Sequence, residues 1–256
     1  MIFLLQEEQF GGTMSLTHIT RFSAVLQEHL KISVILPDNL PNKPLPTIWL
    51  LHGLGENGSC WYRFTTIENL ATQYQVAVIM PNVYRSFYMD ETNGLPYWTY
   101  LTEELMPELR RMLPLSTLRK QNFVIGNSMG GFGALKFGFK HPEWFSAVAA
   151  LSPAVNLRDI IPIMSDISRV FGPKLPKNYL ENLALTAPND QLKEIQWYRS
   201  IGDHDFMRDS NDHFTDFMNS LGMNETYSVT PGDHDWTFWD NEIKKVFAWL
   251  PLSSIN

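Results

Sequence analysis

Residues 126–130 carry the sequence GNSMG directly after the apolar run 122–125, and the stretch from Gly131 onward has helical character. A serine in a G-x-S-x-G motif between a strand and a helix occupies a sharp, strained turn that lifts its hydroxyl above the sheet edge. The flanking positions need glycine because side chains there would collide with the neighbouring strand and helix. The motif therefore predicts a strand–turn–helix unit that exposes Ser128 as a nucleophile. The alternative is a chance glycine-rich turn.

Short continuous apolar runs alternate with helical stretches along most of the chain. Such runs are typical of strands buried on both faces, and their alternation with helices favours a mostly parallel sheet with helices on both faces. A leading hairpin is predicted over 21–26 and 30–36, followed by strands at 47–51, 75–80, 123–125, 147–151, 197–201 and 226–229. The predicted helices are 65–73, 100–112, 131–140, 205–221 and 236–249. We therefore predict an α/β fold.

The length of 256 residues suits one large domain with a substantial core, which we place at 15–256. Residues 1–14 are predicted to be an N-terminal extension, because strand-like sequence begins just after Met14. The segment 156–194 breaks the strand–helix alternation with helical patches and several prolines. An interval of that length is uncommon as a simple loop, so we expect a small helical cap over the site. A peripheral helical excursion without substrate contact is the alternative.

Charge and cysteine content exclude several classes of function. A formal net charge of −7 argues against a broad basic surface for nucleic acid or anionic membrane. The single cysteine, Cys60, excludes an intrachain disulfide and a cysteine-built zinc site. The apolar start, residues 1–5, lacks a basic region and is too short for a signal peptide. We expect a cytoplasmic protein, although one cysteine also fits an exported bacterial protein.

A serine hydroxyl needs a general base within hydrogen-bond reach, and that base needs an acceptor to orient it. Around a G-x-S-x-G motif the chain order is nucleophile, acid, histidine. His234 lies in a tight loop between the predicted strand 226–229 and the predicted helix 236–249, which is where the base belongs. Other histidines after Ser128 lie at a helix end, in a loop or inside a helix: His141, His204 and His213.

The acid should follow the predicted strand 197–201, where the loop offers Asp203 and Asp205. Asp205 also stands where an N-cap would precede the next helix, so capping is its alternative role. Spacing favours Asp205 only slightly and leaves both residues open.

An oxyanion hole needs two preset N–H donors. Met129 follows the nucleophile at the start of its helix, where backbone N–H groups have no helical partner. The second donor is expected in the loop after the predicted strand 47–51, most directly the amide of Leu54. His52 is expected to be structural, with its ring hydrogen-bonded beneath this loop.

Four segments together resemble the esterase D-like carboxylesterases, which are α/β-hydrolases and include bacterial tributyrin esterases and S-formylglutathione hydrolases. These segments are 52–54, 126–135, 202–206 and 232–236, and the resemblance extends over roughly 15–250. The resemblance implies an α/β-hydrolase fold and a Ser-His-Asp triad of Ser128, His234 and Asp205. It also implies that the amide of Leu54 is the second oxyanion donor.

The sequence departs from the glutathione-thioester branch at one place. That branch often has a cysteine shortly after its His-Gly-Leu turn, whereas here residues 55–59 intervene before Cys60. The resemblance is therefore closer to tributyrin-type esterases, and it implies hydrolysis of short-chain acyl esters.

The substrate pocket is expected at the carboxyl ends of the strands, where open α/β sheets bind ligands. Of seven aromatic residues on predicted loops there, about half are expected to face the site, and five are put forward as lining residues: Trp61, Tyr88, Tyr97, Trp98 and Trp236. Such a lining favours an apolar acyl or aryl group.

We predict a serine carboxylesterase that needs no metal or organic cofactor. Its expected partner is a small-molecule ester, with neither nucleic acid nor membrane as a partner and with a homo-oligomer left open. The alternatives are an S-formylglutathione hydrolase or an acyltransferase on the same triad, and a non-catalytic binding module on the same fold.

Overall fold

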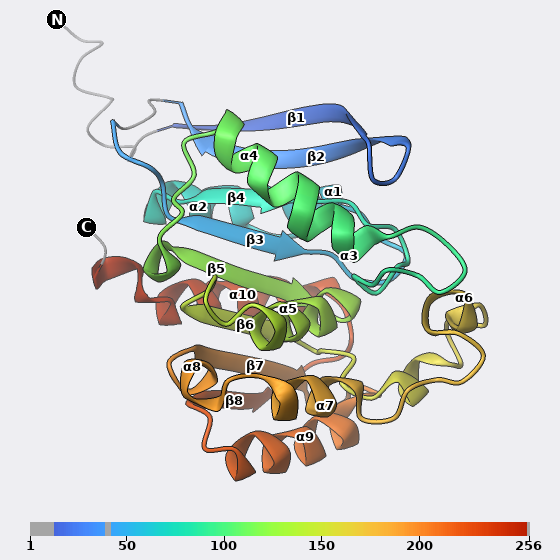
Figure 1. The fold of residues 1–256 in the computed structure, drawn as a ribbon. Coiled ribbons are helices and arrows are strands. Elements are labelled where there is room, and N and C mark those ends of the chain that lie inside the picture. The colour runs from blue at the N-terminus through green and yellow to red at the C-terminus, as the bar shows by residue number, and fades with distance from the viewer. Residues whose placement is uncertain (1–12, 39–41, 255–256) are drawn as a thin grey trace, which may run out of the picture.

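The apolar runs of the sequence form the centre of an eight-stranded sheet in the computed structural model, which describes residues 13–38 and 42–254 (Figure 1). The order across the sheet is β1-β2-β4-β3-β5-β6-β7-β8. The strands are β1 (Met14–Ser23), β2 (Glu28–Pro37), β3 (Thr47–Leu51), β4 (Ala77–Met80), β5 (Asn122–Asn127), β6 (Ala147–Leu151), β7 (Gln196–Gly202) and β8 (Glu225–Thr230). Strands β3 to β8 run parallel, and β1 and β2 join the sheet antiparallel. The predicted mostly parallel sheet is confirmed.

The leading hairpin is longer than its sequence pattern predicts. Pairing of β1 with β2 runs from Met14 opposite Pro37 to Ser23 opposite Glu28, and Gln27 in the turn has a φ of 56°. Met14 is therefore part of the sheet rather than of an extension. Residues 1–12 lie outside the described residues, so the predicted extension stays a prediction there.

The helices follow the predicted positions, with shifts at their ends. They are α1 (Ser59–Phe64), α2 (Ile67–Tyr74), α3 (Tyr97–Thr99), the π-helical η1 (Tyr100–Leu105), α4 (Met106–Met112), η2 (Arg119–Gln121), α5 (Met129–Lys140), η3 (Leu157–Ile160), α6 (Ile167–Phe171), α7 (Tyr179–Thr186), α8 (Asn189–Lys193), α9 (Arg208–Ser220), α10 (Trp236–Trp249) and η4 (Pro251–Ser254). Gln75 ends α2 in the left-handed conformation, so β4 begins later than predicted. Helix α9 also begins later, because the turn after β7 extends to Met207.

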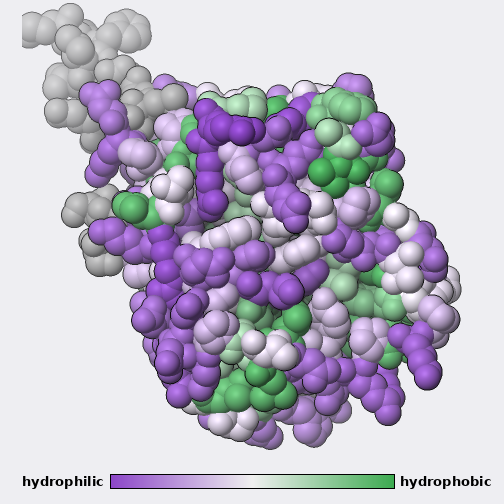
Figure 2. Space-filling model, viewed as in Figure 1, coloured by the Kyte–Doolittle hydropathy of each residue, from purple (hydrophilic) through white to green (hydrophobic). Residues whose placement is uncertain are grey.

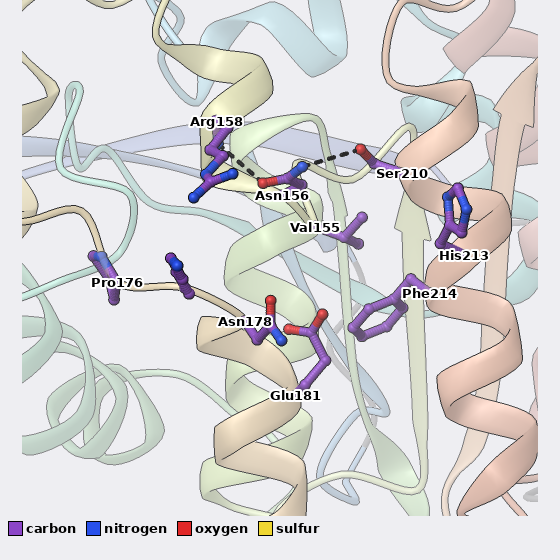
Figure 3. Close-up of a pocket in the computed structure, with 10 residues that line it drawn as sticks. Val155, Asn156, Arg158, Pro176, Asn178, Glu181, Ser210, His213 and Phe214 are labelled. Carbon is purple, nitrogen blue, oxygen red and sulfur yellow. Dashed lines mark hydrogen bonds between the residues drawn. The ribbon is translucent and has the colours of Figure 1, made fainter.

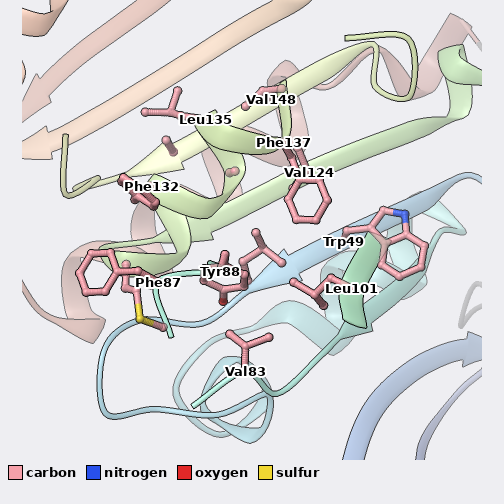
Figure 4. Close-up of a cluster of buried hydrophobic side chains, with 14 of the residues drawn as sticks. Trp49, Val83, Phe87, Tyr88, Leu101, Val124, Phe132, Leu135, Phe137 and Val148 are labelled. Atoms are coloured by element: carbon pink, nitrogen blue, oxygen red, sulfur yellow. The ribbon is translucent and has the colours of Figure 1, made fainter. Parts of the chain in front are cut away.

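Two hydrophobic cores lie on opposite faces of the sheet. Strand residues alternate between them: Trp49 and Val124 face one core, whereas Ile48 and Phe123 face the other. Helices α5 and α9 cover the first face, and α2 and α10 cover the second (Figure 1). Figure 4 shows the first core, where Phe87, Phe132 and other large side chains fill the space between sheet and helix. This double cover explains why the central strands are apolar on both faces.

The segment 156–194, predicted as a cap, contains η3, α6, α7 and α8. Helix α6 lies beyond the carboxyl ends of the parallel strands (Figure 1). It is anchored by Arg169, whose guanidinium pairs with the buried carboxylate of Glu91 at 2.6 Å. Backbone bonds from Thr92 and Asn93 to this helix strengthen the attachment. Its role as a cap remains a prediction.

A buried ion pair joins β7, β8 and α9 next to the loop that carries Asp205. The guanidinium of Arg199 donates to both carboxylate oxygens of Glu225, at 2.7 and 3.1 Å, and both side chains are almost completely buried. It also donates to the backbone oxygen and side-chain oxygen of Asn211. The side chain of Asn211 in turn donates to the carbonyl of Pro153, two residues after β6. The pair therefore fixes α9 against the sheet.

We expect Arg199→Ala to lower the free energy of unfolding by about 3–5 kcal/mol, because it leaves the carboxylate of Glu225 buried without a partner. Chemical denaturation followed by tryptophan fluorescence measures this loss. Arg208→Ala is the control, since its pair with Asp212 is partly exposed and within one helix, worth about 0.3–0.5 kcal/mol. A loss as small as that of the control would show that the buried pair contributes little.

No helix among the described residues is long and apolar enough to cross a membrane. On the face shown in Figure 2 hydrophilic residues predominate, and hydrophobic ones form separate areas. Large exposed hydrophobic side chains are spread along the chain, including Phe22, Leu118 and Leu185. Scattered residues of this kind are normal for a protein surface.

Candidate active site

The turn between β5 and α5 has the strained geometry that its sequence predicts. Ser128 has φ 52° and ψ −116°, an unusual conformation for a residue other than glycine. A Cβ on Gly126 would lie 2.2 Å from the carbonyl oxygen of Gly130, and one on Gly130 would lie 2.3 Å from that of Leu51. Both positions therefore exclude side chains. The Ser128 N–H donates to Leu151 at the end of β6, which holds the turn at the sheet edge.

His234 lies within hydrogen-bond distance of two other predicted site residues. His234 Nε2 is 2.9 Å from Ser128 Oγ, and His234 Nδ1 is 2.8 Å from Asp205 Oδ2. An ionised carboxylate only accepts, so Nδ1–H donates to Asp205 and Nε2 is left to accept from the serine hydroxyl. Asp205 is 4% exposed and its second oxygen accepts from the Met207 N–H at 2.9 Å, so both of its oxygens are held.

Asp203, the alternative acid, points away from this group. Its Oδ1 accepts from the Gly232 N–H at 3.0 Å and lies 2.9 Å from the ring of His204. Its side chain is partly exposed. Asp203 therefore braces the two loops that carry Asp205 and His234 and does not contact the imidazole.

The remaining histidines lie away from Ser128. His213 Nδ1 donates to the carbonyl of Asp209 within α9, and His141 stacks on Trp144 with ring centres 3.7 Å apart. His204 is largely exposed. Of the histidines after Ser128, only His234 is brought to it.

Aromatic rings flank the imidazole of His234 on two sides. Phe206 and Trp239 approach it in edge-type geometry, with ring centres at 4.9 and 5.0 Å. Phe206 is 53% exposed, so it borders the open side of the site, whereas Trp239 is buried and donates to Ser152 Oγ. Sequence analysis missed Phe206, although its position directly after Asp205 was a usable signal.

His52 is a neutral, structural residue beneath the loop after β3, as its sequence position predicts. Its Nδ1–H donates to the carbonyl of Gly53 at 2.8 Å, and its Nε2 accepts from the Val83 N–H at 3.1 Å. Complete burial lowers the pKa of His52 to about 4, against a smaller opposite effect of the Gly53 hydrogen bond. The ring therefore keeps one proton and fixes the direction of the Gly53 carbonyl.

This direction determines where the amide of Leu54 points. In a trans peptide the C=O and N–H point to opposite sides, so the Leu54 N–H points away from the His52 ring. In the part of the chain that the structure describes, neither this N–H nor that of Met129 has a hydrogen-bond partner. A Cβ on Gly130 would lie 2.8 Å from the carbonyl oxygen of His52, so the loop and the start of α5 are packed together. Both predicted donors are thus free and lie on adjoining segments.

Two predicted pocket residues belong to the core. Trp61 and Tyr88 are fully buried, and their polar atoms are used internally, by the carbonyls of Leu51 and His52 respectively. The prediction is wrong for both, because large aromatic side chains near strand ends gain more from burial than from lining an open site. Tyr88 instead supports the loop that carries Leu54.

Two further predicted pocket residues, Tyr97 and Trp98, belong to the short helix α3. Tyr97 is 5% exposed and packs against Tyr84. Trp98 covers Nζ of Lys136, which is 3.9 Å from the ring centre, and contacts Phe137 in the second half of α5. Because Ser128 precedes the opposite end of α5, the placement of Trp98 at the site is wrong.

Trp236 is the predicted pocket residue that lies near the imidazole. It packs edge-on against Trp239, whose ring contacts His234, with ring centres 5.1 Å apart. It is partly exposed and also contacts Trp61 and Phe64.

A separate hollow of about 350 Å³ lies between the segment 156–194 and α9 (Figure 3). Val155 and Phe214 form its apolar part, and its polar lining includes Arg158, Glu181 and His213. None of Ser128, Asp205 and His234 lines it. Among the described residues, no His, Cys, Asp and Glu side chains are grouped so that three or more could hold a metal ion.

A carboxylate that sequence analysis missed lies beside the Leu54 loop. Glu56 Oε2 accepts from the Gly53 N–H at 2.7 Å and from Asn127 Nδ2 at 3.3 Å. Burial raises the pKa of Glu56, against smaller effects of these hydrogen bonds. Nothing in the local sequence distinguishes Glu56 from an ordinary polar loop residue.

Comparison with known proteins finds relatives along almost the whole chain. The model of the Esterase family matches residues 23–250. An acetyl esterase of Caldicellulosiruptor saccharolyticus is 30% identical, over 93% of this chain and 98% of that protein.

Two solved structures from Staphylococcus aureus have the same fold. The fluorophosphonate-binding serine hydrolase FphF has a TM-score of 0.86 and 28% identity over 93% of this chain and 99% of its own. The S-formylglutathione hydrolase FrmB has a TM-score of 0.80 and 29% identity over 93% and 98%. Their similarity shows that the fold is that of the α/β-hydrolases.

Proposed function

Because the chain belongs to the Esterase family and is a serine hydrolase of the esterase D-like type, we propose that Ser128, His234 and Asp205 form its catalytic triad. The proposed reaction is hydrolysis of short-chain acyl or aryl esters. One observation carries the proposal: His234 is hydrogen-bonded to Ser128 at 2.9 Å through one ring nitrogen and to Asp205 at 2.8 Å through the other. This arrangement activates a serine hydroxyl at neutral pH.

In the acylation step, Ser128 Oγ attacks the ester carbonyl carbon while its proton moves to His234 Nε2. The carboxylate of Asp205 stabilises the imidazolium that forms. The negative charge on the former carbonyl oxygen is stabilised by the N–H groups of Leu54 and Met129. Collapse of this intermediate breaks the bond to the alcohol, which takes the proton from Nε2 and leaves the acyl group on Ser128.

Deacylation repeats these steps with water. The water gives a proton to His234 Nε2 as its oxygen attacks the acyl carbon, and the same two N–H groups stabilise the second intermediate. Collapse returns the proton to Ser128 Oγ and releases the carboxylic acid. Every proton in the cycle therefore passes through one ring nitrogen.

The relative from Caldicellulosiruptor saccharolyticus is an acetyl esterase, which supports a small acyl group in the substrate of this protein. The exposed ring of Phe206 beside His234 offers an apolar contact at the mouth of the site. The likeness to the S-formylglutathione hydrolase FrmB supports a second candidate, a glutathione thioester. The ratio of kcat/KM for S-formylglutathione to that for p-nitrophenyl acetate separates the two candidates.

We expect a fluorophosphonate probe to label the folded protein once, on Ser128, because only a serine paired with a base attacks such a phosphorus centre at neutral pH. Intact mass measures the stoichiometry and peptide mapping locates the label. Unfolded protein, which lacks the Ser128–His234 contact, is the control and should remain unlabelled. Absence of labelling, or a label on another serine, would contradict the proposed nucleophile.

A further inference from the structure

We propose that Glu56 is a positioning residue that holds the Leu54 loop against the segment of the nucleophile and so sets the oxyanion hole. This inference rests on the proposed function, because it concerns how the same site stabilises its transition state. Glu56 does not reach the reacting atoms in this role. It acts through Gly53 and Asn127, which are both hydrogen-bonded to one oxygen of its carboxylate.

A single oxygen of Glu56 bridges the two halves of the site. Oε2 accepts from the Gly53 N–H at 2.7 Å and from Asn127 Nδ2 at 3.3 Å. Gly53 immediately precedes Leu54, and Asn127, which is fully buried, immediately precedes Ser128. Each half carries one of the two proposed donors. The bridge therefore fixes the spacing of the donors rather than the position of either one alone.

Gly53 is held from both of its polar groups. The Gly53 N–H donates to the carboxylate of Glu56, and the Gly53 carbonyl accepts from the ring of His52 at 2.8 Å. The peptide plane that carries the Leu54 N–H therefore cannot rotate freely. The backbone N–H of Glu56 adds a bond to the same carbonyl at 3.3 Å. Preset donors cost no reorganisation when the oxyanion forms, which is the reason that rigidity here increases the rate.

The contact also explains why residue 53 is glycine. A Cβ there would lie 2.9 Å from Glu56 Oε2 and 3.1 Å from Asn127 Nδ2. Both neighbours are the ends of side chains, so a methyl group would displace them without moving the backbone of the core. Gly53→Ala should therefore break the same bridge as a change at Glu56, but by displacing the carboxylate rather than by removing it.

The bridge depends on the charge of Glu56. Burial raises its pKa, while the bonds from Gly53 and Asn127, the indole of Trp236 and the charge of His234 lower it less. The other titratable groups that respond to its charge are Cys60 of α1 and Tyr88. A carboxylate with a raised pKa takes up its proton at a higher pH than an ordinary glutamate, and a neutral carboxyl is a weaker acceptor.

We expect Glu56→Ala to lower kcat about tenfold to a hundredfold and to leave KM within about threefold of the wild-type value. The loss in kcat should be smaller than the roughly 10²–10³-fold loss on deleting an oxyanion donor, because both donors are still present. Glu56→Gln, which keeps an acceptor oxygen but no charge, should fall between wild type and Glu56→Ala. The matched control is Glu68→Gln on the exposed side of α2, expected to match wild type. Binding of a phenylboronic acid, which mimics the tetrahedral intermediate, should weaken in parallel with kcat.

A pH profile separates positioning from a purely structural role. On its acid side, kcat/KM of the wild type should show an ionisation additional to that of the general base, and Glu56→Gln should lack it. Thermal unfolding of each variant shows whether the fold persists. If Glu56→Ala fails to fold, Gly53→Ala and Glu56→Gln carry the test.

The proposal is overturned if folded Glu56→Ala and Gly53→Ala keep the kcat and boronic acid affinity of Glu68→Gln. It is equally overturned if Glu56→Gln keeps the additional ionisation. In either case Ser128→Ala would still be inactive, which leaves the proposed function intact. Activity in Ser128→Ala would instead remove the proposed function itself.

Discussion

Replacing Ser128 with alanine should lower kcat for p-nitrophenyl acetate by about 10⁶-fold, the size of effect seen when a triad serine is removed. The hydroxyl at 2.9 Å from His234 Nε2 is the nucleophile of the proposed acylation step, and without it no acyl-enzyme forms. A neighbouring serine, Ser152, cannot replace it, because its Oγ is buried and accepts from the indole of Trp239. Purified protein assayed with p-nitrophenyl acetate and butyrate provides the measurement.

The fold should survive this change. Alanine and serine have the same backbone requirements, so the strain of φ 52° exists in both proteins and contributes little to the difference in stability. Ser220→Ala at the end of α9 is a suitable control, since its hydroxyl bonds only within its own helix. Full activity in Ser220→Ala with none in Ser128→Ala, at equal circular dichroism, is the expected pattern. Undiminished turnover in Ser128→Ala would exclude the proposed nucleophile.

Asp205→Asn should lower kcat by about 10⁴-fold, whereas Asp203→Asn should change it by less than about threefold. An asparagine at 205 presents an N–H or an uncharged oxygen to His234 Nδ1, so the ring loses its fixed tautomer and the imidazolium loses its counter-charge. The Met207 N–H bond can persist through the amide oxygen, which preserves the loop.

Asp203 serves as the matched comparison because it lies on the same loop. Its bond from the Gly232 N–H also persists with an amide oxygen, and no contact joins it to His234. Steady-state kinetics of both variants, with thermal unfolding to verify the fold, measure the difference. A large loss in Asp203→Asn with a small one in Asp205→Asn would exchange the two roles.

The strands and the serine turn could be predicted because their signals are local. The run Thr47–Leu51 is a strand with the predicted ends, and the glycines around Ser128 are required by contacts that any strand–turn–helix unit of this kind makes. His234 could be selected because the fold class fixes the chain order and one histidine follows the last strand. Where prediction failed locally, as at the start of β4, a left-handed residue at Gln75 extends the end of a helix.

The pocket residues could not be predicted for a different reason. Sequence position places Trp61, Tyr88 and Trp98 near strand ends but does not decide whether each ring turns inward or outward. That choice depends on partners far along the chain, such as the carbonyl of His52 for Tyr88 and Nζ of Lys136 for Trp98. The free energy of burying an aromatic ring determined the outcome.

By itself, the sequence determined an α/β fold with Ser128 on a strained turn and His234 in the loop that approaches it. Spacing left Asp203 and Asp205 open and the family resemblance implied Asp205, but only the tertiary structure shows which carboxylate contacts His234, because that histidine is 29 residues away along the chain. The contact of Glu56 with Asn127 likewise joins residues that are 71 positions apart in the sequence. Distances between such residues are set by packing of the whole sheet, which no local pattern records.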